Sequence, residues 1–176
     1  VFVFKSKYKK EFIRDTNIKI VDALMSSCAA PSFFDPYKVD NYLLADGGLW
    51  ANNPSLVAIT EAITRLCSDL DSIRLLSLGT VFSRKYYGVR NFSEKNWGLL
   101  TKWQKQNFVE YNFALQSKSI ENIVGLLMPK NNYLRLNCDV DNKLKMDDCK
   151  TVEFLKSKAD NAFTNNSKKI EKFLKG

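Results

Sequence analysis

The side chain best suited to chemistry is the carboxylate of Asp46, which lies in a short run with an unusual pattern. The run reads Ala45-Asp46-Gly47-Gly48-Leu49-Trp50-Ala51-Asn52-Asn53-Pro54. Asp46 follows a short apolar stretch, Tyr42–Ala45, and precedes two glycines. The end of a strand, beside glycines, is where α/β proteins place catalytic groups. Asp46 is therefore a candidate general base, a group that takes a proton from a nucleophile.

The residues around Asp46 predict a strand, a tight turn and a helix. The pair Gly47-Gly48 can adopt backbone angles closed to other residues, and without side chains it lets a partner approach Asp46 closely. Asn53 is a good N-cap residue, and Pro54 suits the first position of a helix. We expect Asn52 and Asn53 to hold the turn and cap the helix rather than to touch a substrate.

A second interpretation of Asp46 is purely structural. Asp-Gly-Gly turns are common, and their aspartate usually accepts hydrogen bonds from nearby backbone amides. Taken alone, the three residues favour this structural role. The longer run, from Asp46 to Pro54, is far rarer by chance and favours a functional one.

Alternating apolar segments predict an α/β fold with a mainly parallel sheet flanked by helices. The expected strands are Val1–Lys5, Tyr42–Ala45, Ile73–Leu78 and Tyr133–Asn137. The expected helices are Lys19–Ala30, Pro54–Cys67, about Asn96–Met128 and two pieces between Lys150 and Leu174. In the first of these helices, Ile20, Val21, Leu24 and Cys28 form an apolar face. The basic, aromatic segment Ser83–Arg90 is expected to form a loop near the active-site crevice.

Three segments together resemble the second half of a patatin-like phospholipase domain. They are Val21–Phe34, Asp46–Pro54 and Leu75–Thr80, in matching order and approximate spacing. The resemblance covers about residues 1–80 specifically and is weaker beyond them. It implies a three-layer domain that hydrolyses lipid esters with a Ser-Asp dyad and no cofactor or metal. Asp46 would be the aspartate of that dyad, supported by the motif residues Gly47, Gly48, Asn52 and Asn53.

The serine of such a dyad lies in a Gly-x-Ser-x-Gly motif, and no serine of this chain has glycine on both sides at that spacing. No glycine-rich loop that could form an oxyanion hole precedes Asp46 either. The chain also opens at Val1, without a methionine. We therefore expect residues 1–176 to be the C-terminal part of a patatin-like domain. Its partners would be a lipid ester substrate and the missing N-terminal half, and an exposed apolar edge predicts self-association as an alternative.

Other functions are compatible with the same residues. A thioesterase or a general esterase could use the same dyad. A basic regulatory or interaction module that binds a nucleotide or an anionic lipid, without catalysis, is the alternative outside enzymes.

The excess of basic over acidic residues in this chain has several explanations. The formal net charge is +8, from 27 basic and 19 acidic residues. The lysines cluster at Lys5, Lys7, Lys9 and Lys10, and again at Lys143, Lys145, Lys150, Lys156, Lys158, Lys168, Lys169, Lys172 and Lys175. Such clusters suit an anionic membrane or nucleic acid. Because the C-terminal lysines alternate with apolar residues at helical spacing, we favour solvated helix faces and expect no nucleic-acid partner.

The cysteine and histidine content limits the chemistry. The four cysteines show no C-x-x-C pairing and the chain has no histidine, so we expect no zinc site and no Ser-His-Asp triad. Cys28 and Cys67 fall in apolar helical patterns and are expected in the core. Free thiols suit a reducing, cytoplasmic setting, with peripheral membrane contact as an addition.

Overall fold

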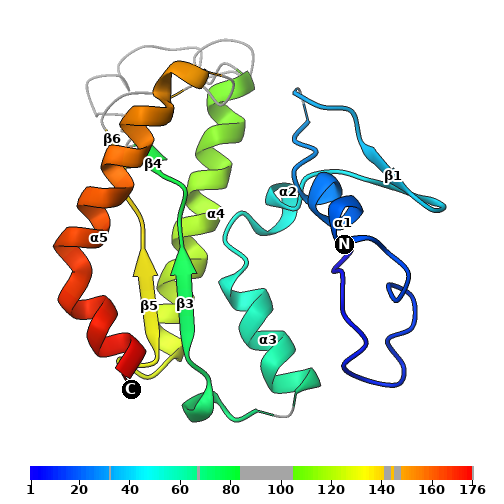
Figure 1. Ribbon diagram of the computed structural model, residues 1–176, viewed down its shortest axis with the longest axis horizontal. Helices are drawn as coiled ribbons and strands as arrows, with labels where there is room; N and C mark the ends of the chain where they lie inside the picture. Colours follow the sequence, from blue (N-terminus) through cyan, green and yellow to red (C-terminus); the bar gives the residue numbers. More distant parts are fainter. Residues whose placement is uncertain (32, 67, 84–104, 141–143, 145–147, 176) are drawn as a thin grey trace, which may run out of the picture. The chain divides into compact units, whose positions relative to one another are not determined.

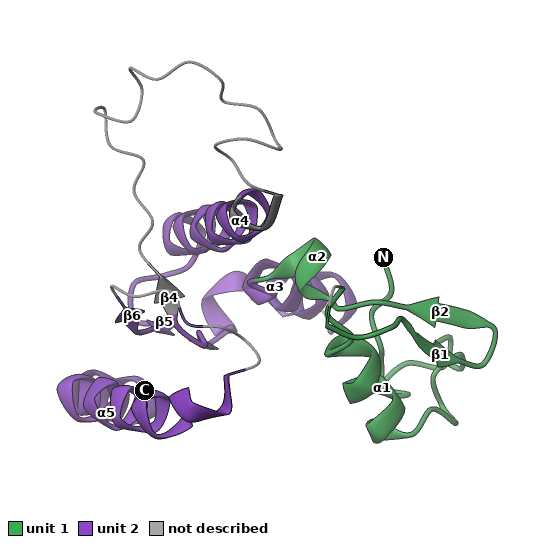
Figure 2. Ribbon diagram, turned by 90° about the horizontal axis from the view of Figure 1, so that it is seen from above, with its two compact units in different colours: residues 1–52 green, residues 53–176 purple. Residues whose placement is uncertain are grey.

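The computed structural model describes residues 1–31, 33–66, 68–83, 105–140, 144 and 148–175 (Figure 1). The chain divides into two compact units, Val1–Asn52 and Asn53–Gly176 (Figure 2). Asp46, Gly47, Gly48 and Asn52 belong to the first unit, and Asn53 opens the second.

The first unit contains two helices and a hairpin: α1 (Ile20–Ser27), β1 (Tyr37–Val39), β2 (Tyr42–Leu44) and α2 (Gly48–Ala51). Strands β1 and β2 pair antiparallel, with Tyr37 opposite Leu44. Asp40 in the turn between them has a φ of 49°, a left-handed conformation that aspartate tolerates better than most residues.

The N-terminal residues of the first unit form no strand, so the predicted strand Val1–Lys5 is wrong. The backbone of this segment bonds to side chains instead of to a neighbouring strand. The Arg14 guanidinium donates to the Val3 carbonyl over 2.7 Å, and the Lys5 amide donates to Asp15 Oδ2 over 2.8 Å. Arg14 also donates to both carboxylate oxygens of Asp15, which lowers the pKa of that carboxyl below its ordinary value of 3.8.

The second unit places helices on both faces of a parallel strand pair. Strands β3 (Leu75–Leu78) and β5 (Tyr133–Leu136) are parallel, and a shorter parallel pair joins β4 (Phe82–Ser83) to β6 (Asp139–Val140). The helices are α3 (Ser55–Arg65), α4 (Lys105–Leu127) and α5 (Val152–Lys175), with 3-10 turns at Leu70–Ser72 and Cys149–Thr151. Figure 2 shows α4 and α5 on opposite sides of the strands.

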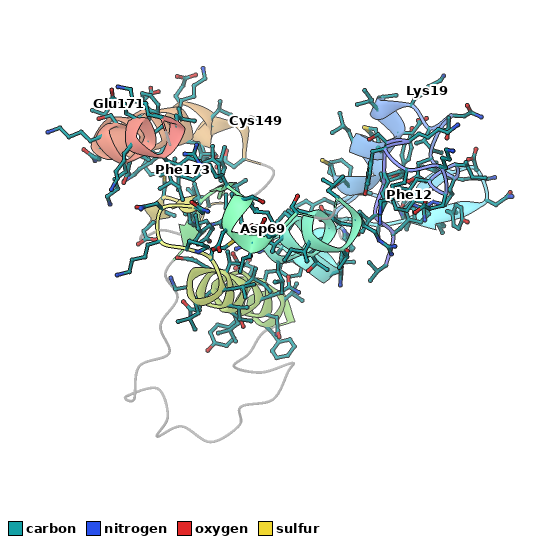
Figure 3. The ribbon with its side chains drawn as sticks, turned by 90° about the horizontal axis from the view of Figure 1, so that it is seen from below. Phe12, Lys19, Asp69, Cys149, Glu171 and Phe173 are labelled. Atoms are coloured by element: carbon teal, nitrogen blue, oxygen red, sulfur yellow. The ribbon has the colours of Figure 1, made fainter. Side chains whose placement is uncertain are left out.

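The core of the second unit lies between α3, α4 and the strand pair. Ile59, Val124 and Met128 are buried there, and Leu75 and Tyr133 pack against them from the strands. Helix α5 covers the other face. Figure 3 shows Phe173 directed from α5 toward the strands, where the guanidinium of Arg74 lies 4.7 Å from the centre of its ring.

The fold is a mixed α/β structure with small sheets, as the alternating pattern predicted in outline. The expected two C-terminal helical pieces are instead one continuous helix, α5, because no glycine or proline interrupts residues 152–175. The predicted helix Asn96–Met128 corresponds to α4 from Lys105 onward. Residues 84–104, which include most of the predicted loop Ser83–Arg90, lie outside the described residues.

Helix α1 forms as predicted, but its apolar face is not buried. Ile20, Val21 and Leu24 are 80%, 55% and 59% exposed, and Cys28 is exposed as well. The expectation that Cys28 is a core residue is therefore wrong. Cys67, the other cysteine expected in the core, lies outside the described residues.

Candidate functional site

Asp46 is held in place by backbone groups on both of its sides. Its own N–H donates to the carbonyl of Ala29 over 2.9 Å, just after α1. Its Oδ1 accepts from the Gly48 N–H over 2.5 Å, and its carbonyl accepts from the Leu49 N–H over 3.3 Å. These contacts join the end of β2 to the start of α2, a short helix that was not predicted and that lies between the predicted strand and the predicted helix, α3.

The two carboxylate oxygens of Asp46 have different surroundings. Oδ1 makes the turn contact that a structural aspartate would make. Oδ2 accepts no hydrogen bond from the residues that the structure describes. The side chain is half-buried. One oxygen therefore fixes the orientation of the carboxylate, while the other is able to accept a proton from a group brought to it.

What matters about the two glycines is the room left by their missing side chains, not an unusual backbone angle. Gly47 has a φ of −62°, an ordinary helical value, so the expected special conformation is not needed there. A Cβ on Gly48 would lie 2.8 Å from Asp46 Oδ1 and 3.5 Å from Asn52 Oδ1. A Cβ on Gly47 would meet only Ser27 Oγ, at 3.9 Å. Gly48 is therefore the glycine that leaves room for the Asp46 carboxylate.

The two asparagines of the motif have separate places. Asn52 ends α2 and is exposed, in the same unit as Asp46. Asn53 is fully buried in the second unit, where its Oδ1 accepts from the Ser55 N–H over 3.2 Å. Helix α3 begins at Ser55, one residue later than predicted, so the N-cap position falls on Pro54 and not on Asn53 as predicted. The Asn53 side chain still accepts from the first N–H of the helix.

Sequence reasoning missed two kinds of contact at these residues. The carbonyl of Ala29 positions Asp46, but a backbone acceptor leaves no signal in residue types. The Ser55 hydroxyl donates to Asn53, Ser77 bonds to Ser55, and the half-buried Arg135 donates to Ser77, a pairing that depends on the register of β3 against β5.

Within the described parts of the chain, no group of three or more His, Cys, Asp or Glu side chains is arranged to hold a metal. Among those same residues, no helix is long and apolar enough to cross a bilayer.

Comparison with known proteins gives consistent matches to one family. Residues 2–59 match the family model described as patatin-like phospholipase. The chain is 37% identical over 86 residues to a cGAMP-activated phospholipase of Vibrio cholerae, covering 44% of this chain and 24% of the relative. It is 34% identical over 100 residues to a cGAMP-activated phospholipase of Escherichia coli, covering 53% and 28%.

A mammalian relative extends the match over most of the chain. The calcium-independent phospholipase A2-gamma of Oryctolagus cuniculus is 28% identical over 169 residues, which cover 95% of this chain and 20% of the relative. The chain thus spans about a quarter of the length of these curated relatives. The resemblance to patatin-like phospholipases is confirmed: residues 2–59 match the model of that family, and the relatives that the chain resembles are phospholipases.

Proposed function

We propose that this chain provides the dyad aspartate, Asp46, of a lipid acyl hydrolase that cleaves phospholipid or other lipid esters. The observation that carries the proposal is the geometry of the Asp46 carboxylate. Gly48 fixes Oδ1, and Oδ2 accepts no hydrogen bond within the described residues. The segment that contains Asp46 is also the one that matches the phospholipase family.

The proposed chemistry uses Asp46 as a proton shuttle. A serine hydroxyl is a weak nucleophile at neutral pH and needs an adjacent base. Oδ2 of Asp46 takes the serine proton as the serine oxygen attacks the ester carbonyl, and the proton then passes to the departing alcohol. Water repeats the sequence on the acyl-serine. Such base catalysis accelerates a reaction by about 10²–10⁴-fold, and each oxyanion donor contributes about 3 kcal/mol.

The serine and the oxyanion loop have no counterpart in this sequence, so the proposal assigns them to polypeptide outside residues 1–176. The uncovered face of α1 supports a further covering segment, because Ile20, Val21 and Leu24 are mostly exposed. On this proposal, residues 1–176 are the C-terminal part of a patatin-like domain. Its small parallel pairs then belong to a larger sheet between two helix layers.

The proposed substrate class is tested with the protein that contains both this chain and the serine-bearing segment. We expect it to release fatty acid from mixed phospholipid vesicles and p-nitrophenol from a p-nitrophenyl ester. A thioester substrate, offered in parallel, separates a thioesterase from an ester hydrolase. Hydrolysis of the thioester alone, or of none of the three substrates, contradicts the proposed function.

A basic interaction module remains the second candidate, because one specific feature favours it. Lys168, Lys169 and Lys172 are exposed on α5 and form no ion pair within the described residues. They suit an anionic lipid surface, which is also where a phospholipid hydrolase must work. Binding to vesicles without any hydrolysis would favour this second candidate over the first.

A further inference from the structure

Ser27, the last residue of α1, carries its hydroxyl group beside the motif that contains Asp46. A Cβ on Gly47 would meet Ser27 Oγ at 3.9 Å. Gly47 follows Asp46 directly, and consecutive Cα atoms are about 3.8 Å apart, so Ser27 Oγ lies within about 9 Å of the Asp46 Cα. All three residues belong to the first unit, so this placement depends on contacts within one compact unit.

Two hydrogen bonds hold α1 in this position within the first unit. The Asp46 N–H donates to the carbonyl of Ala29, two residues after Ser27, over 2.9 Å. At the other end of the helix, the Tyr37 hydroxyl of β1 donates to Asp22 Oδ1 over 3.0 Å. Helix α1 is thus joined both to the turn of Asp46 and to the hairpin.

The hydroxyl of Ser27 is not used by its own helix. A serine or threonine in a helix commonly donates to the carbonyl four positions earlier. Ser26 does so over 2.6 Å and is 2% exposed, and Thr60 and Thr64 of α3 make the same kind of contact. Ser27 is exposed, and its hydroxyl bonds to no group among the residues that the structure describes. Its proton is therefore available to a bound molecule.

The proposed chemistry limits what an ester could present to Ser27. The carbonyl oxygen of the ester belongs in the oxyanion loop, which the proposed function assigns to polypeptide outside residues 1–176. The alcohol oxygen must come within hydrogen-bond reach of Asp46, because Asp46 passes the proton to it. The alcohol part of the ester therefore extends from the Asp46 carboxylate. In a glycerophospholipid this part carries ester and phosphate oxygens, which accept hydrogen bonds, whereas an aryl ester places an apolar ring there.

We propose that Ser27 is a substrate-binding residue, whose hydroxyl donates to the polar alcohol part of the ester held against Asp46. This rests on the proposed function, because the reaction with Asp46 is what places the ester. A hydrogen bond to a charged oxygen is roughly twice as strong as one between neutral groups. Ser27 therefore favours esters of glycerophosphate over esters of apolar alcohols.

The test uses the protein that contains both this chain and the serine-bearing segment, with two soluble substrates that share one acyl chain. They are dihexanoyl phosphatidylcholine below its critical micelle concentration and p-nitrophenyl hexanoate. Ser27→Ala removes the hydroxyl, and Ser27→Thr keeps it. Ser26→Ala is the matched control, because it removes a neighbouring hydroxyl that is buried and donates within α1.

We expect Ser27→Ala to lower kcat/KM for the phosphatidylcholine by about tenfold or more and to leave that for the aryl ester within about twofold. Ser27→Thr should recover most of the loss. Ser26→Ala should lower the melting temperature and change both substrates by the same factor. Because misfolding also affects both substrates equally, the ratio of the two kcat/KM values separates binding from structure.

An unchanged ratio in Ser27→Ala overturns the proposal, and so does a wild-type protein that cleaves the aryl ester but not the phosphatidylcholine. Asp46→Asn, assayed on the same substrates, reports on the proposed function itself. If Asp46→Asn abolishes both activities while Ser27→Ala leaves the ratio unchanged, only the role of Ser27 fails. If Asp46→Asn keeps wild-type activity, the proposed function fails, and the placement of the ester beside Ser27 fails with it.

Discussion

Gly48 is the residue whose replacement should disturb Asp46 most directly. A methyl group at position 48 would lie 2.8 Å from Asp46 Oδ1, closer than a real Cβ contact allows, so the carboxylate must move. We expect Gly48→Ala to lower ester hydrolysis by about tenfold or more. Gly47→Ala is the control, because its methyl would make only a 3.9 Å contact with Ser27 Oγ. Equal activities of the two alanine variants would contradict this account of Gly48.

Asp15 gives a residue-level prediction about pH. Its pKa lies below 3.8 because Arg14 donates to the carboxylate in the folded protein. A carboxyl with a lowered folded pKa stabilises the fold above its unfolded pKa and loses that effect as the pH falls through its folded pKa. Asp15→Asn should therefore lower the melting temperature at pH 6. The difference from wild type should shrink as the pH falls below about 4 and through the lowered pKa of the folded protein. A difference that stays constant down to pH 2 would contradict the ion-pair assignment.

At the scale of single residues, the sequence predicted those contacts that form between residues close together in the chain. Asp46 lies in a turn after β2, and the Asn53 side chain accepts from the Ser55 N–H at the start of α3, because both contacts depend on neighbours within a few positions. The contact of Asp46 with Ala29 and that of Ser77 with Arg135 could not be predicted. They depend on segments far apart in the chain meeting in one particular register.

At the scale of elements, α5 presents the surface best suited to an anionic membrane. Lys172 lies three positions after Lys169 and four after Lys168, so the three lysines share one face, while Phe173 packs against Arg74. Each basic residue near such a surface contributes about 1 kcal/mol. Reversing all three charges to glutamate should weaken binding to anionic vesicles by more than about tenfold, and higher salt should weaken wild-type binding.

The matched control for α5 reverses three dispersed, exposed lysines: Lys19, Lys38 and Lys130. It changes the net charge by the same amount without touching the helix. Vesicle co-sedimentation measures both variants. If the control weakens binding as much as the α5 variant, net charge rather than this face explains the attraction. If neither protein binds, the lysines form only a solvated face.

The elements themselves were predictable where apolar spacing is regular. Helices α1 and α3 and strands β3 and β5 lie where the pattern placed them, within a few residues. Strand β2 lies where the strand Tyr42–Ala45 was predicted, but β1 and the hairpin went unpredicted, although Asp40-Asn41 between short strands is a turn signal. The segment Val1–Lys5 forms no strand, and its backbone bonds instead to side chains: the Val3 carbonyl to Arg14 and the Lys5 amide to Asp15.

At the scale of the whole molecule, uncovered apolar surface is the main feature. Ile20 and Leu24 of α1, Leu43 of β2 and Leu78 of β3 are each more than half exposed. Exposed patches and unpaired strand edges favour association. We expect residues 1–176 alone to hydrolyse no ester and to self-associate, as sedimentation velocity would show. A well-behaved monomer that cleaves esters would contradict the proposal that the serine lies elsewhere.

The sequence predicted the mixed α/β class but not how its strands assemble. Strands β3 and β5 are parallel neighbours although β4 and α4 lie between them in the chain. A parallel pair needs such a crossover, and residue patterns alone do not say which strands it joins. The three two-stranded pairs among the described residues could therefore not be predicted from the residue pattern.

The most direct test of the central claim is the activity of Asp46→Asn in the protein that contains the serine-bearing segment. Asparagine keeps the shape of the side chain, and its oxygen can still accept from Gly48, but it cannot take a proton from serine. Asp35→Asn is the control, because it removes an exposed carboxylate from the same unit. Fatty-acid release should fall by at least about 100-fold in Asp46→Asn and stay at the wild-type rate in Asp35→Asn. Activity of Asp46→Asn within about tenfold of wild type would contradict the assignment of Asp46 as the catalytic base.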